Sequence, residues 1–266
     1  MRIGVFDSGF GGLTVLRALL ERVPADYVYL GDTARLPYGA KSRETVARYA
    51  VSSAKFLVEE QGAEFLVIAC NTASALALDA IRDAVPVPVL GVVETGANAA
   101  EASSKTGDVL VIATAATVES HAYAAACAAR RLRAIEKACP LLVPLVEEGW
   151  IEHPVTAEVL RIYMTELMEQ ARVADLNADT LVLGCTHYPL LRAQIERVVP
   201  ERLKVIDSAE VTADQVGQRL GVGRGPGATA KFFATDSVKK FRALGSRFLG
   251  REMDGVELVE LERGRE

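Results

Sequence analysis

The sequence predicts an α/β protein made of two similar domains, each built around a doubly wound parallel sheet. Its 266 residues are enough for two such domains, and short apolar runs alternate with helical stretches along the chain. Two of these runs, in residues 67–74 and 181–189, end alike in a cysteine and a threonine-containing polar turn. The order of strand, polar loop, helix, strand and cysteine thus occurs once in each half. This repeated order predicts a duplication with a pseudo-two-fold axis and one active site in the cleft between the domains.

The expected elements follow the chain in order. Strands are expected at residues 2–6, 27–30, 64–69, a short run ending at 90, 108–112, 180–184, 204–206 and 229–233. Helices are expected from 13, at 42–61, 73–83, from 94, after 117, at 156–174, 188–198 and at the C-terminus. Residues 141–149 are interpreted as an irregular connection. The first domain is expected to comprise residues 1–97 and 207–266, and the second domain residues 98–206.

Composition narrows the class of protein. Half of the residues are apolar and about a quarter are charged, as in an ordinary globular protein. The net charge of −5 gives no general reason to expect a nucleic acid or an anionic membrane as partner. The N-terminus leads directly into a strand without a signal-peptide pattern, and no apolar run approaches the length of a membrane span. We therefore expect a cytoplasmic protein with no nucleic-acid or membrane partner.

A glycine-rich loop at residues 7–12 follows the first strand and precedes the helix from Leu13. It is similar to a phosphate loop, but it matches neither the dinucleotide-binding nor the Walker A pattern, so a nucleotide is not favoured. A small carboxylate would suit the same free N–H groups at the helix start. The other interpretation is a plain tight turn in which Asp7 or Ser8 caps the helix.

The two matched cysteines, Cys70 and Cys185, lie where a predicted strand ends and a helix begins. In open α/β sheets this carboxyl edge is where ligands bind, and a helix N-terminus favours ionisation of a thiol. A single cysteine at a strand end is usually a buried core residue. Cys127 and Cys139 keep that interpretation because neither lies in a polar turn. The matched contexts of the other two predict a site with two thiols facing each other.

Two facing thiols suit a reaction that inverts a carbon centre in both directions, since one base is needed on each face. A thiol can be tuned so that both protonation states are accessible, and Asp7 and His187 are placed in sequence to hold or relay a proton. The three histidines and four cysteines show no zinc-binding spacing. The residues therefore predict acid–base chemistry without a metal.

Five motifs together resemble the glutamate racemases of the aspartate/glutamate racemase superfamily. They are FDSGFGGL at 6–13, GDT at 31–33, LPYG at 36–39, ACNTA at 69–73 and LGCTHYPL at 183–190. The resemblance implies two flavodoxin-like domains, often paired as a homodimer. It also implies interconversion of L- and D-glutamate without pyridoxal phosphate, metal or another cofactor, which supplies D-glutamate for peptidoglycan. Some members are activated by a peptidoglycan precursor through an N-terminal extension; this chain begins at the first strand, so we expect no such activation.

The resemblance also implies roles for residues. Cys70 and Cys185 match the catalytic thiols, and Asp7, Glu147 and His187 match the residues that assist them; Glu148 is the alternative to Glu147. The residues that match substrate-binding positions are Asp7, Ser8, Pro37, Tyr38, Gly39, Asn71, Thr72, Thr114, Thr117, Thr186 and His187. Where the family often has Gly-Thr-x-x-Thr, this chain has Ala at position 113 but keeps both threonines.

Three other functions stay open. Aspartate differs from glutamate by one methylene, worth about 1–3 kcal/mol in a binding pocket, so an aspartate racemase is the nearest alternative. A cysteine hydrolase using Cys185 and His187 would need only one thiol. A non-catalytic amino-acid-binding protein would also use two domains and a cleft, but binding alone gives no reason for paired thiols.

Overall fold

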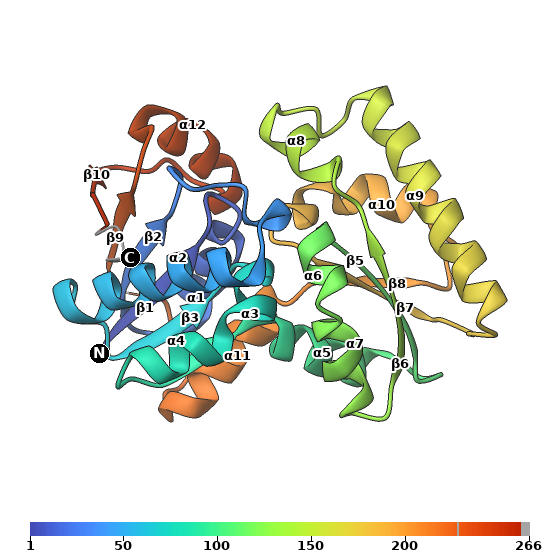
Figure 1. The fold of residues 1–266 in the computed structure, drawn as a ribbon, viewed down its shortest axis with the longest axis horizontal. Coiled ribbons are helices and arrows are strands. Elements are labelled where there is room, and N and C mark those ends of the chain that lie inside the picture. The colour runs from blue at the N-terminus through green and yellow to red at the C-terminus, as the bar shows by residue number, and fades with distance from the viewer. Residues whose placement is uncertain (228, 262–266) are drawn as a thin grey trace.

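The computed structural model describes residues 1–227 and 229–261 and contains two separate parallel sheets (Figure 1). The six-stranded sheet has the order β10-β9-β2-β1-β3-β4, and the four-stranded sheet has the order β6-β5-β7-β8. The strands are β1 (Arg2–Asp7), β2 (Asp26–Gly31), β3 (Phe65–Ile68), β4 (Val89–Gly91), β5 (Asp108–Ala113), β6 (Arg133–Ala138), β7 (Thr180–Gly184), β8 (Lys204–Ile206), β9 (Thr229–Ala234) and β10 (Val256–Leu258).

Helices cover both sheets. They are α1 (Leu13–Arg22), η1 (Tyr38–Ala40), α2 (Arg43–Lys55), η2 (Phe56–Glu60), α3 (Asn71–Leu76), α4 (Leu78–Ala84), α5 (Val92–Ser103), α6 (Ala115–Glu119), α7 (Ala122–Ala128), α8 (Leu142–Glu147), α9 (Pro154–Val173), η3 (Tyr188–Leu191), α10 (Arg192–Val198), α11 (Ala209–Leu220) and α12 (Val238–Leu249). No helix among the described residues is long and apolar enough to cross a membrane.

The strand orders of the two sheets agree with the predicted duplication. Four consecutive strands of the larger sheet, β2-β1-β3-β4, correspond one to one with β6-β5-β7-β8. In each sheet the chain moves first to one side of its first strand and then to the other, so a switch point lies between β1 and β3 and another between β5 and β7. Ligand sites in doubly wound sheets lie at the carboxyl end of such switch points. The predicted fold class is confirmed, and it places the loops after these four strands at the site.

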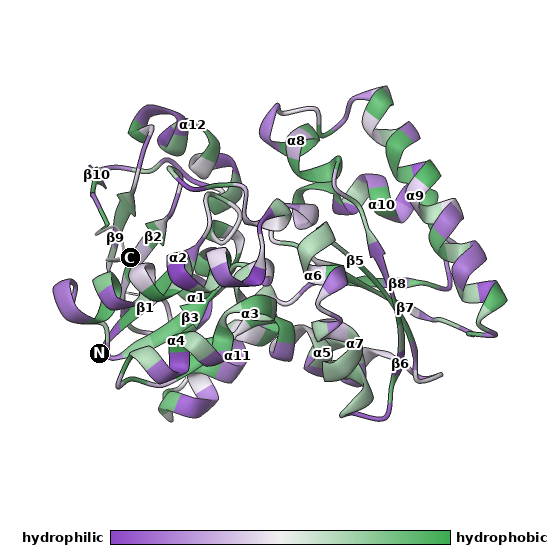
Figure 2. Cartoon of the chain, in the orientation of Figure 1, coloured by the Kyte–Doolittle hydropathy of each residue, from purple (hydrophilic) through white to green (hydrophobic). Residues whose placement is uncertain are grey.

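The cores follow from the strand sequences. All six residues of β5 are buried, and alternate side chains pack on opposite faces: Leu110 and Ile112 in one cluster, Val109 and Val111 in another. Figure 2 shows hydrophobic stretches in the strands of both sheets and helices whose faces mix hydrophobic and hydrophilic residues. Strands buried on both faces read as continuous apolar runs, which is why they could be predicted from the sequence.

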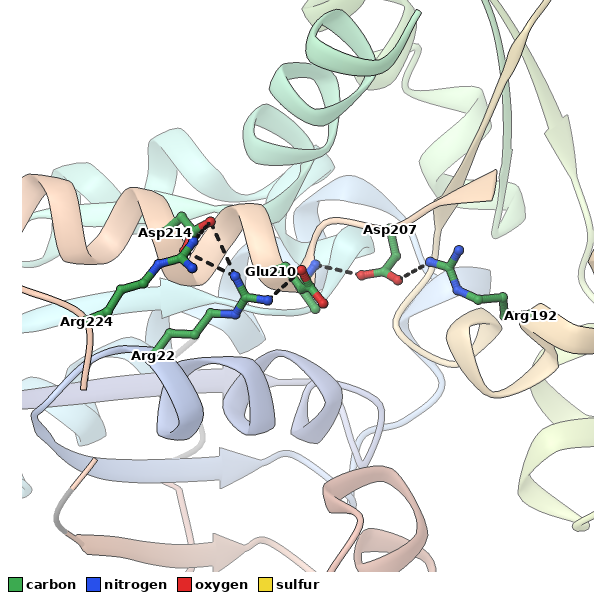
Figure 3. Close-up of polar contacts among 7 residues, drawn as sticks. Arg22, Arg192, Asp207, Glu210, Asp214 and Arg224 are labelled. Atoms are coloured by element: carbon green, nitrogen blue, oxygen red, sulfur yellow. Dashed lines mark hydrogen bonds and ion pairs between the residues drawn. The ribbon is translucent and has the colours of Figure 1, made fainter. Parts of the chain in front are cut away.

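The return from the second sheet to the first is fixed by a polar link (Figure 3). Asp207 accepts a hydrogen bond from Arg192 at 2.5 Å and one from the first N–H of α11 at 2.9 Å. Further along α11, Glu210 and Asp214 lie 2.5 and 3.3 Å from Arg22 of α1. Each exposed ion pair contributes at most about 1 kcal/mol, so the buried contacts of α11 with α1 carry more of the stability.

The structure differs from the expected elements at several places. Strand β6 was not predicted, because its charged and alternating sequence is that of a half-exposed edge strand. Residues 141–149, expected to be irregular, contain α8. The helix expected at 73–83 is interrupted at Ala77, which leaves α3 and α4. Helix α11 and the short strand β10 were not predicted either.

The domain limits stay a prediction. The strands of the larger sheet come from residues 2–91 and 229–258, and those of the smaller sheet from 108–206. Helix α5 runs through the proposed limit between residues 97 and 98. Residue 228 and residues 262–266 of the proposed first domain lie outside the described residues.

Candidate active site

A cavity of about 340 Å³ lies where the carboxyl edges of the two sheets meet. Most of the predicted site residues line it: Ser8, Pro37, Tyr38, Gly39, Cys70, Asn71, Thr72, Thr114, Glu147, Cys185, Thr186 and His187. Asp7 and Thr117 are buried beside it, and Cys127 and Cys139 are buried without lining it. The two cysteines that end equivalent strands thus face one cavity, as the duplicated pattern predicts.

Cys70 is the N-cap of α3, directly after β3. Its sulfur accepts a hydrogen bond from the Ala73 N–H at 3.4 Å and lies 3.4 Å from the Ser8 hydroxyl. Burial, followed by the charge of Asp7, raises the pKa of the Cys70 thiol to about 12, although the bonds from Ser8 and Ala73 act in the opposite direction. The N-terminus of α3 does favour ionisation through the Ala73 N–H, as expected, but desolvation outweighs this contribution at Cys70.

Asp7 ends β1 and accepts the Gly9 N–H at 2.8 Å. It does not cap the following helix, and neither does Ser8, because Gly12 is the N-cap of α1. Burial raises the pKa of Asp7, while the positive charge of His187 opposes that rise. A carboxyl group with a raised pKa beside the Cys70 thiol is suited to exchange a proton with it.

The glycines of this loop serve close packing. A Cβ on Gly11 would lie 2.2 Å from the Thr186 hydroxyl and 2.7 Å from the His187 ring. The loop after β1 therefore packs directly against the turn after β7, and only glycine leaves room for this contact. This explains the glycine-rich pattern without a bound phosphate.

The second thiol belongs to a chain of three groups. The Cys185 sulfur lies 3.9 Å from His187 Nδ1, and His187 Nε2 lies 3.2 Å from a carboxylate oxygen of Glu147. Burial by itself lowers the pKa of His187, but its bonds to Cys185 and Glu147 outweigh this and raise the pKa to about 10. The imidazole is therefore positively charged at neutral pH. Glu147 provides this contact, whereas Glu148 lines the cavity as an exposed residue.

The C-terminal helix α12 contributes two neighbours that sequence reasoning missed. The Phe248 ring lies edge-on to the His187 ring at 5.0 Å between centroids, and Lys240 Nζ lies 3.9 Å from Glu147. Nothing in the local sequence marks these side chains, because an amphipathic pattern predicts a helix but not its distant partner. The apolar residues Leu36, Ala40, Ala115, Pro140, Val143 and Pro144, also missed, complete the cavity wall.

Threonine hydroxyl groups from the loops that follow the two sheets meet at the cavity. Thr72 lies 3.0 Å from Thr114 and 3.3 Å from Thr117, and the last two lie 3.0 Å apart. Thr117 is fully buried, so it supports the other two and does not line the cavity. The Tyr123 hydroxyl holds the amide oxygen of Asn71 at 2.6 Å, which fixes the side chain next to Cys70.

The raised pKa of Cys70 predicts a distinctive alkylation profile. In a Cys185→Ser variant, the rate of Cys70 alkylation by iodoacetamide should increase about tenfold for each pH unit between about 7 and 10, because the thiolate fraction of a thiol with a pKa near 12 grows in that proportion. Peptide mass spectrometry separates this site from Cys127 and Cys139. A plateau below about pH 9 would show that Cys70 ionises much more readily than its surroundings indicate.

The fold and cavity define a duplicated α/β protein that presents one thiol from each half to a shared site. Residues 3–216 match the model of the Asp/Glu/Hydantoin racemase family, and the chain belongs to this family.

Curated proteins and solved structures match over nearly the whole chain. A glutamate racemase from Koribacter versatilis is 53% identical, and the alignment covers 97% of each chain. The structure of glutamate racemase from Francisella tularensis in complex with D-glutamate is 34% identical, with a TM-score of 0.87 and 98% of each chain covered. The structure of glutamate racemase from Thermus thermophilus in complex with β-chloro-D-alanine is 42% identical, with a TM-score of 0.82 and coverage of 98% of this chain and 97% of the other.

Proposed function

We propose that this protein is a cofactor-independent glutamate racemase that moves the α-proton with two thiols. The observation that carries the proposal is that Cys70 and Cys185, at equivalent strand ends of two matching sheets, line one cavity. The names of the relatives at 53% and 42% identity support glutamate as the substrate.

The proposed reaction is a proton transfer in each direction. A thiolate on one face takes the α-proton, and the electron pair of the C–H bond passes into a carbanion stabilised by the adjacent carboxylate. The thiol on the other face then gives its proton to the same carbon, which inverts the centre and leaves that sulfur as the thiolate. Which of Cys70 and Cys185 is the base depends on the enantiomer bound, and the opposite enantiomer reverses both roles.

The assisting groups differ between the two sides. At Cys185, the His187 imidazolium stabilises negative charge on the sulfur, and Glu147 holds the imidazole in place. At Cys70, burial and the charge of Asp7 oppose ionisation. Asp7 therefore takes up a proton when Cys70 must act as the base, for which its raised pKa is suited.

The cavity chemistry supports a dicarboxylic amino acid. Its wall carries the hydroxyls of Ser8, Thr72, Thr114 and Thr186 together with the Asn71 amide. These polar groups suit carboxylates. We further propose that the enzyme works as a homodimer in the cytoplasm and supplies D-glutamate for peptidoglycan, as its resemblance to the family implies.

The alternatives have weaker support. A hydrolase using Cys185 and His187 has no use for a second thiol in the same cavity, and a binding protein has no use for either thiol. An aspartate racemase would differ from the proposed glutamate racemase only in the length of the substrate that it accepts.

The test is circular dichroism of L-glutamate, D-glutamate and both enantiomers of aspartate, each incubated with the purified protein and reductant. Decay of both glutamate signals to zero, with a rate on aspartate at least about tenfold lower, is the expected result. Faster decay of aspartate would make the protein an aspartate racemase. No decay with either substrate would refute the racemase proposal.

A further inference from the structure

A buried carboxylate outside the cavity binds two side chains of the loop that follows it and one side chain about 200 residues later in the chain. Asp32, at the end of β2, is fully buried. It accepts the Tyr38 hydroxyl at 2.5 Å, the Arg35 Nε at 2.9 Å and the Thr235 hydroxyl at 2.9 Å. The charge of Asp32 is thus shared among the loop that follows it and the end of β9.

The same loop is tied to β9 at two further points. The Ala34 N–H donates to the Thr235 hydroxyl at 2.9 Å. The Thr33 hydroxyl donates to the Asp236 carbonyl at 2.6 Å and accepts the N–H of that residue at 2.9 Å. The C-terminal segment therefore fixes residues 33–36, directly before the part of the loop that lines the cavity.

Tyr38 is the connection between this network and the site. It lines the cavity together with Pro37 and Gly39, yet its hydroxyl is bonded to Asp32. Burial and the charge of Asp32 raise the pKa of Tyr38 well above its usual value, so the hydroxyl remains a donor. A Cβ on Gly39 would lie 2.9 Å from Thr114, so a small displacement of this loop would also disturb Thr114, which lines the same cavity.

We propose that Asp32 is a positioning residue for substrate binding, which acts by anchoring the Tyr38 hydroxyl and so holding residues 37–39 against the cavity. The Tyr38 hydroxyl is therefore an anchor for the loop and not a ligand for the substrate. This inference rests on the proposed function, in which residues 37–39 contact glutamate.

The test is a double-mutant cycle of Asp32→Asn and Tyr38→Phe. Each single variant should raise KM for both enantiomers about tenfold and change kcat less than about threefold, because the loop binds substrate but does not move the proton. The double variant should be no worse than Asp32→Asn within about twofold, because both changes break one interaction. The proposal would be overturned if the KM increases of the two single variants multiplied in the double variant, or if only kcat fell.

The chain provides a matched control on the same pair of strands. Asp26, at the other end of β2, accepts the Thr229 hydroxyl of β9 at 2.6 Å, far from the cavity. Asp26→Asn should leave KM unchanged within about twofold, as expected for a contact remote from the substrate. If Asp26→Asn raised KM as much as Asp32→Asn, the effect of Asp32→Asn would reflect a general loss of sheet stability, and the proposal would be overturned.

Hydrogen exchange separates failure of this inference from failure of the proposed function, since it needs no substrate. Amides 33–41 should exchange at least about fivefold faster in Asp32→Asn and in Tyr38→Phe than in Asp26→Asn. If the wild-type protein does not racemise glutamate but this pattern is seen, the anchor stands and the proposed function fails. Unchanged exchange in both variants overturns the anchor itself.

Discussion

Replacement of Cys70 or Cys185 by serine should lower kcat/KM for racemisation of glutamate by at least about 10²-fold, since a hydroxyl is a far weaker base than a thiolate. The loss should be the same in both directions. Enantiomers have equal free energies, so the equilibrium constant is one, and kcat/KM must fall equally for L- and D-glutamate. The kcat/KM values of the two directions therefore cannot reveal which face each thiol serves.

Isotope effects can reveal it. In each variant, an α-deuterium on the substrate should slow the direction in which serine is the base at least about twofold more than the reverse direction, because C–H cleavage limits only the former. The sensitive direction should switch between Cys70→Ser and Cys185→Ser. The measurement is circular dichroism with protonated and deuterated L- and D-glutamate. The same sensitive direction in both variants would contradict the placement of one thiol on each face.

Replacement of His187 by asparagine should lower kcat about 10²-fold and slow alkylation of Cys185 about tenfold, because it removes a positive charge 3.9 Å from the sulfur. Alkylation of Cys70 should change less than about threefold. The matched control is His121→Asn, which removes an exposed histidine that lies 3.3 Å from Glu136 and outside the cavity. If that control slows Cys185 alkylation as much, the local charge is not the cause.

The pH dependence follows from the sign of the His187 shift. The imidazole is charged below its pKa of about 10 and neutral above it. The faster alkylation of Cys185 in the wild-type protein than in His187→Asn should therefore disappear as the pH rises through that value. Glu147→Gln removes one of the two contacts that raise this pKa, so the loss should occur at a lower pH, shifted by about one unit. An unchanged midpoint would show that Glu147 does not support the charge.

The sequence was sufficient for eight of the ten strands in the described residues and for most of the cavity. Runs such as residues 180–184 are buried on both faces, so their apolar character is continuous, and their polar ends mark the carboxyl edge. Because Cys70 and Cys185 end equivalent strands, their meeting in one cavity could be predicted from the motif order alone. The roles of these residues in catalysis stay predictions.

The features that the sequence did not indicate depend on contacts between segments that are far apart in the chain. The edge strand β6 is half exposed, and α8 is only six residues long, so neither has a strong periodic pattern. The raised pKa of Cys70 results from burial, which a local motif does not record. Phe248 reaches His187 only because α12 packs beside the cavity, some 60 residues later in the chain.

The most direct measurement of two-base racemisation is the fate of the α-hydrogen at early times. L-glutamate with protium at the α-carbon would be incubated in deuterated buffer with reductant and no added cofactor. Proton NMR and chiral chromatography would then follow both enantiomers before equilibrium. With one thiol on each face, newly formed D-glutamate should carry deuterium while the remaining L-glutamate keeps its protium. Protium retained in the D-glutamate, or deuterium entering both enantiomers equally from the start, would contradict the two-thiol account.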